Sequence, residues 1–177
     1  MEKYVYFRND NQEIDYCSGD VYLNFLDYAF EEADHFMLVY VNYYGKGYTS
    51  TMKAFKKSLE PFKIKSRTNP SWPGTPNTFA KNTTYKIVFY KNHKDAKEIL
   101  KKVSCLSGWT RPNYPQDLAF FKGNQCWFYS ISHEKIGVII HATDDDIDFV
   151  VKNNLALRES VKISRDDSFD EYDEELV

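Results

Sequence analysis

The sequence is poor in cysteine, glycine and proline, with three, seven and six of these residues among its 177. The cysteines, Cys17, Cys105 and Cys126, are odd in number and lack both metal-ligand and redox-motif spacing, so we expect reduced thiols in a cytosolic protein. The few glycines form no phosphate-binding loop, and the cysteines and histidines show no zinc-ligand pairing. No cofactor and no metal are therefore predicted.

Long apolar runs are also missing. The longest candidate, Phe36 to Val41, is interrupted at Asn42, whereas a membrane helix needs about 20 apolar residues. The first residues, Met1 to Tyr4, contain no basic region followed by an apolar run, so no secretory signal is expected. We therefore expect a cytoplasmic protein with no membrane contact.

The chain has enough apolar residues for one core. At 177 residues and 42% hydrophobic it suits a single domain, because a chain of roughly 150 residues buries about two-thirds of its unfolded surface. The aromatic share is 17%, with fourteen tyrosines and thirteen phenylalanines. Aromatic rings bury large areas, so we expect them to dominate the core.

Charge is segregated along the chain. Residues 1–45 contain two basic and nine acidic residues, residues 46–102 contain fourteen and three, and residues 103–177 contain seven and fourteen. The three blocks therefore have net charges of −7, +11 and −7 within an overall charge of −3. Like charges gathered together produce a field that scattered charges would cancel, which favours a charged partner.

Hydrophobic periodicity predicts eleven elements in the order β-α-β-α-β-β-α-β-β-β-α. The predicted strands are 4–7, 36–44, 62–67, 85–90, 118–121, 126–129 and 136–141, and the predicted helices are 20–34, 50–60, 95–103 and 143–150. This order indicates a single α+β domain over residues 1–165, with a mixed, mainly antiparallel sheet and about four helices packed on it. Residues 166–177 form an acidic tail that we expect to be disordered.

Local patterns refine this description. Ser18 or Asp20, Thr49 or Ser50, and Thr143 are predicted to cap the first, second and last helices. Lys63, Lys65 and Arg67 alternate with less polar residues, which predicts a strand with one wholly basic face. The segment 68–82, rich in proline and asparagine, is predicted to be a long loop with Trp72 in its middle, and loops of this length are often functional.

The basic block 46–102 also contains many aromatic residues. Cations can bind phosphates and rings can stack on bases, so this block favours single-stranded nucleic acid as one partner. The proposed contacts are Lys63, Lys65, Arg67, Trp72 and Lys86. Trp109, Arg111 and Trp127 are further candidate binding residues, outside the block.

A hydrolytic site is a second alternative. His133 and Glu134 follow a predicted strand and lie close in sequence to Asp117. A histidine beside carboxylates can act as a general base, although such a pair at a strand end more often stabilises a turn.

Several segments resemble a known family: Asn69 to Thr75, Trp109, and Tyr114 to Phe121 running into Cys126 to Glu134. They are similar to a family of uncharacterised bacterial proteins, some of which carry the label stage III sporulation protein AH. The resemblance implies a bacterial cytoplasmic protein with recurring motifs at Trp72, Asp117, Trp127, His133 and Glu134. It implies no established catalytic residue.

The segregated charge and the lack of a catalytic motif favour a small binding protein. We expect an immunity-type protein that neutralises a charged protein partner, such as a toxin, by electrostatic and shape complementarity. In this interpretation the acidic ends of the chain contact a basic partner.

Overall fold

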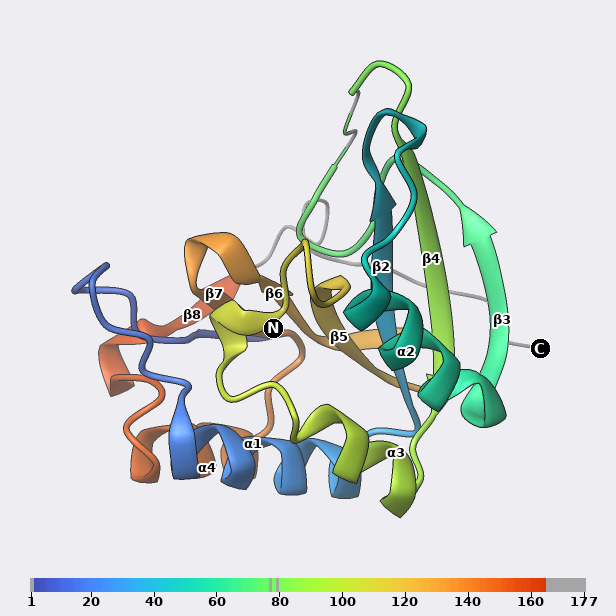
Figure 1. The fold of residues 1–177 in the computed structure, drawn as a ribbon. Helices are drawn as coiled ribbons and strands as arrows, with labels where there is room; N and C mark the ends of the chain where they lie inside the picture. The colour runs from blue at the N-terminus through green and yellow to red at the C-terminus, as the bar shows by residue number, and fades with distance from the viewer. Residues whose placement is uncertain (1, 77, 79, 165–177) are drawn as a thin grey trace.

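The protein folds as an eight-stranded antiparallel sheet with four helices on one side (Figure 1). The computed structural model describes residues 2–76, 78 and 80–164, so the predicted acidic tail, 166–177, lies outside the described residues. The helices are α1 (Gly19–Glu32), α2 (Ser50–Leu59), α3 (Lys94–Leu100) and α4 (Asp144–Lys152). The strands are β1 (Glu2–Tyr6), β2 (His35–Asn42), β3 (Lys63–Thr68), β4 (Thr84–Lys91), β5 (Gln116–Lys122), β6 (Gln125–Ile131), β7 (Ile136–Ile139) and β8 (Val161–Ser164).

The predicted α+β class, the four helices and the order of the eleven elements are confirmed. All the strand pairs of the described residues are antiparallel, so the sheet is not mixed there. Strand β8 was not predicted. It contains only two apolar residues, Val161 and Ile163, and pairs with β1, far away in the sequence.

The strand order is β3-β4-β2-β5-β6-β7-β1-β8, with β2 and β5 in the middle. The larger hydrophobic cluster lies between the sheet and the helices, with rings such as Phe25, Phe120 and Phe128 packed together. A second cluster covers the other face and takes its described buried members from strands, from Trp72 and from Ile140, directly after β7. The expectation of an aromatic core is confirmed.

All three predicted caps occupy the N-cap positions, and two of them form side-chain capping bonds. The Thr49 side chain accepts a hydrogen bond from the Met52 amide, and Thr143 forms a capping box with Asp146. Ser18 occupies the cap position of α1 but forms no side-chain capping bond. The threonine caps fix where α2 and α4 begin.

The predicted basic face of β3 is wrong, because the strand contains an irregularity in register between Lys63 and Lys65. Lys63 pairs with Tyr90, whose ring belongs to the helix-covered core, whereas Lys65 pairs with Phe89 on the opposite face. A bulge adds one residue to a strand and so reverses the alternation beyond it. Lys63 therefore lies on one face of the sheet, and Lys65 and Arg67 lie on the other.

Asp146 joins the capping box to the core. Its fully buried carboxylate accepts hydrogen bonds from the Tyr28 hydroxyl (2.7 Å), the Thr143 amide (2.8 Å) and the Trp127 indole (3.4 Å). Asp145 beside it is exposed. The two neighbouring acids therefore have different roles.

We expect Asp146→Ala to lower the free energy of unfolding by about 2–4 kcal/mol, because it removes one half of the capping box and leaves buried donors without an acceptor. Asp145→Ala is the matched control and should change it by less than about 0.5 kcal/mol. Urea unfolding followed by fluorescence measures both. Equal effects of the two substitutions would contradict this account of Asp146.

Candidate functional site

A buried carboxylate organises one end of the sheet. Asp117, in β5, is 1% exposed and has a left-handed backbone conformation with φ 53°. Its carboxylate accepts hydrogen bonds from the Trp72 indole nitrogen and the Ser132 amide, both at 2.9 Å, and from the Gln116 side chain at 3.4 Å. Burial raises the pKa of Asp117, and the hydrogen bonds from Ser132 and Trp72 oppose that shift.

Trp72 fastens the 69–83 loop to the sheet. Its side chain is 3% exposed and packs against the Tyr85 ring, with the ring centroids 5.3 Å apart. Two residues on, a Cβ at Gly74 would lie 2.5 Å from the Tyr129 ring, and the backbone there has φ 78°. Only glycine fits this close approach, so the loop is held against the sheet at two neighbouring points.

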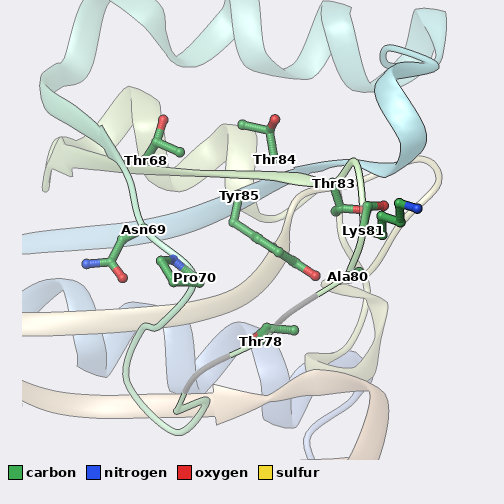
Figure 2. A pocket seen from close by; sticks show the side chains of 9 residues that line it. All are labelled: Thr68, Asn69, Pro70, Thr78, Ala80, Lys81, Thr83, Thr84 and Tyr85. Carbon is green, nitrogen blue, oxygen red and sulfur yellow. The ribbon is translucent and has the colours of Figure 1, made fainter.

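A pocket of about 590 Å³ lies between this loop and the beginning of β4 (Figure 2). The residues that line it are mostly small and polar, and they are Thr68, Asn69, Pro70, Thr78, Ala80, Lys81, Thr83, Thr84 and Tyr85. The Tyr85 side chain extends along the pocket with its hydroxyl toward Thr78 and Ala80. Sequence reasoning placed Tyr85 in a strand but did not identify this pocket.

The predicted hydrolytic residues are not assembled into one site. Asp117 is buried and bonded to Trp72 and Ser132, whereas the side chains of His133 and Glu134 are 56% and 54% exposed. His133 and Glu134 approach each other at 3.5 Å, and no hydrogen bond joins His133 to Asp117 among the described residues. The geometry gives the histidine no buried carboxylate to orient it as a base.

Two of the candidate binding tryptophans belong to the core. Trp109 is fully buried and donates its indole hydrogen bond to the Tyr22 hydroxyl at 2.9 Å, and Trp127 is 3% exposed beside Asp146. The prediction that these two side chains contact a partner needs correction, because neither presents a surface. Arg111 is exposed and stacks on the Tyr43 ring, with 3.6 Å between its guanidinium carbon and the ring centroid.

The basic block 46–102 folds into α2, β3, β4 and α3, at one edge of the sheet (Figure 1). We call this region the basic half. Its acids Glu60 and Glu98 form ion pairs within it, and Asp27 of α1 pairs with Lys97 and Lys101. Nine lysines have no ion pair among the described residues, and they are Lys46, Lys53, Lys56, Lys57, Lys81, Lys86, Lys91, Lys94 and Lys102.

Within the basic half, lysines lie close enough to affect one another. Burial lowers the pKa of Lys56, and the charges of Lys86 and Lys63 lower it further. A groove of about 320 Å³ runs beside α2, between Thr51, Ala54 and Ser58 of the helix and Lys102 and Tyr114. The basic half therefore combines a positive field with a shaped surface.

The other edge of the sheet, with β7, β1 and β8, also forms internal ion pairs. Asp144 pairs with Lys3 at 2.6 Å, and Asp148 pairs with Arg158 at 2.8 Å. Each pair joins groups within the same region, so the acidic charge is partly neutralised there.

None of the described helices is long and apolar enough to cross a membrane. Among the described residues, no group of three or more histidines, cysteines or acids could hold a metal ion. Scans against protein-family models, curated proteins and solved structures found no match to this chain. The resemblance to the bacterial family therefore stays a prediction.

The raised pKa of Asp117 predicts a specific pH dependence. The folded protein binds this proton more tightly than the unfolded chain, so the stability that Asp117 contributes is present at low pH and is lost as pH rises through the folded-state pKa. Asn tolerates the same backbone conformation. Because the Trp72 indole and the Ser132 amide donate to different oxygens of the Asp117 carboxylate, the single oxygen of Asn cannot accept both bonds in this geometry. We expect the stability advantage of wild type over Asp117→Asn to be larger at pH 4 than at pH 7, as measured by urea unfolding.

Asp144→Asn is the control. Its hydrogen bond with Lys3 lowers the pKa of Asp144, so the small advantage of wild type over this variant should increase with pH. If the advantage of wild type changed with pH in the same direction for both variants, the raised pKa of Asp117 would be contradicted.

Proposed function

We propose that the protein binds a charged protein partner, and that its basic half provides the contact surface. The observation that carries the proposal is the strand order, which places β3 and β4 of the basic block at one edge of the sheet, whereas β1 of the first acidic block lies next to the other edge. Complementary potentials speed encounter and suppress wrong partners. A role of the immunity type, in which binding neutralises the partner, fits this surface.

The basic half is favoured over the acidic ends as the contact surface. Lys53 and Lys57 of α2 and Lys102, which lines the groove beside α2, are exposed and have no ion pair among the described residues. The acidic side has already formed ion pairs through Asp144 and Asp148. An acidic partner would therefore meet unpaired cations, whereas a basic partner would have to compete with existing pairs.

A protein partner is favoured over single-stranded nucleic acid. Nucleic-acid binders of this kind need exposed rings on which bases stack. Trp72, the ring expected to do this, is 3% exposed and bonded to Asp117, and Tyr85 and Tyr90 are also buried. Among the described residues of this region, Tyr44 is an exposed ring, at 63%, and one ring gives little stacking surface beside nine unpaired lysines. This balance supports recognition of an acidic protein surface.

We expect Lys53→Glu combined with Lys57→Glu to weaken partner binding by at least about tenfold at physiological salt, because both residues face solvent on one side of α2. The partner is captured from a lysate of the source cells with wild-type protein and is then titrated by calorimetry. Lys152→Glu combined with Lys162→Glu is the matched control, since it changes net charge equally on the acidic side. The control should bind the partner within about twofold of wild type.

Nuclease treatment of the lysate distinguishes the two classes of partner. Capture that survives nuclease and fails only with the variant in α2 supports the proposal. Capture that disappears with nuclease would favour nucleic acid, and equal binding by both double variants would overturn the assignment of the basic half.

A further inference from the structure

The pocket beside the 69–83 loop contains two buried hydroxyls without a hydrogen-bond partner among the described residues. Tyr85 is 5% exposed, and its hydroxyl has no hydrogen-bond partner among the described residues. The Thr78 hydroxyl oxygen is buried in the same pocket and also has none. Buried polar groups are nearly always hydrogen-bonded, so two unpaired hydroxyls lining one cavity indicate a surface built for a polar ligand.

The chemistry of the lining defines the ligand. Five of the nine lining residues carry hydroxyl groups, which both donate and accept, and Asn69 adds an amide. No carboxylate is among the lining residues that the structure describes. Such a wall can exchange hydrogen bonds with the hydroxyls of a polyol, and it gives no acid with which to bind a cation.

Cations lie at the edge of this pocket. Lys81 is exposed in its lining and has no ion pair among the described residues. Arg111 lies close enough for its charge to oppose the rise that burial causes in the pKa of Tyr85. The Lys81 side chain points away from Tyr85 and Thr78 in Figure 2, so it has to rotate toward a ligand. An ammonium group brought to a hydroxyl-lined cavity favours an anionic group at one end of the ligand, such as a phosphate.

The pocket is also held in shape. Trp72 packs on the Tyr85 ring, and Asp117 fixes the Trp72 indole through a 2.9 Å hydrogen bond. Figure 2 shows the Tyr85 side chain lying along the cavity rather than pointing to solvent. A volume of about 590 Å³ is within the range of pockets that hold small molecules, and a ligand would find the main hydroxyl already in place.

We propose that this pocket binds a small polyol with one anionic group, of the sugar phosphate class. The hydroxyls of Tyr85 and Thr78 bind the polyol, and Lys81 binds the phosphate. The pocket lies within the basic half, but none of its lining residues lines the groove beside α2.

Calorimetric titration with a fixed panel tests the proposal. The panel is ribose 5-phosphate, glucose 6-phosphate, the two unphosphorylated sugars and inorganic phosphate. We expect at least one sugar phosphate to bind with a Kd below about 1 mM, and the matching sugar and inorganic phosphate to bind at least about tenfold more weakly. The proposal is overturned if neither sugar phosphate binds at about 10 mM, or if inorganic phosphate binds as tightly as both.

Variants locate the binding. Tyr85→Phe should weaken the sugar phosphate by about tenfold or more, because it removes one buried hydroxyl and little else. Lys81→Ala should weaken the sugar phosphate but leave the unphosphorylated sugar unchanged. Tyr114→Phe, at the groove beside α2, is the control and should bind as wild type does.

The thermal midpoint of ligand-free Tyr85→Phe provides an independent readout. Because the hydroxyl has no partner in the fold, its removal should leave the midpoint unchanged or raise it. A lowered midpoint would show that the hydroxyl has a structural role, and unchanged affinity in Tyr85→Phe would place any binding elsewhere. Either result would overturn the assignment of Tyr85.

Discussion

Strand β2 pairs with β4 along all eight of its residues and with β5 along much of its length, and its six interior side chains are buried. A strand covered on both faces and paired on both sides has to lie inside the sheet. The chain before β2 forms β1 and α1, and the chain after it forms α2, β3, β4 and α3. Strands β3 and β4 extend the sheet on one side of β2, and β5, β6, β7, β1 and β8 extend it on the other. The strands of the basic block therefore lie at one edge of the sheet, far from β1.

The end of the sheet at which β5 begins depends on one buried carboxylate. Asp117 lies where β5 begins, and it joins that strand to the 69–83 loop through Trp72 and to the turn after β6 through Ser132. Burying a carboxylate is costly unless hydrogen bonds compensate for the lost water, and here an indole and a backbone amide do so. The result is a rigid contact between Trp72 and Tyr85, and the pocket wall is built on that contact.

The elements could be predicted because each carries a local signal. The helix stripes, the strand runs and the caps at Thr49 and Thr143 are properties of neighbouring residues. Strand β8 and the bulge in β3 depend instead on pairing with distant segments. The tryptophans illustrate the same limit, because their indole groups bond to side chains 45, 87 and 19 residues away, at Asp117, Tyr22 and Asp146. Nothing in the local sequence distinguishes such a buried ring from an exposed one.

The charge segregation and the pocket also differ in how far the sequence alone can reveal them. Net charge is additive along a chain, so the basic block was visible before any fold was known, and the strand order only had to preserve it. The pocket cannot be summed from the sequence in this way. It forms only when Thr78 of the loop and Tyr85 of β4 line the same cavity, and the local sequence of neither segment indicates the other. Trp72 links the two kinds of information. The sequence singled it out as a ring for a partner, whereas the structure uses it as the support on which the Tyr85 hydroxyl is positioned. A conspicuous residue in a long loop can thus contribute to binding by holding a less conspicuous neighbour in place.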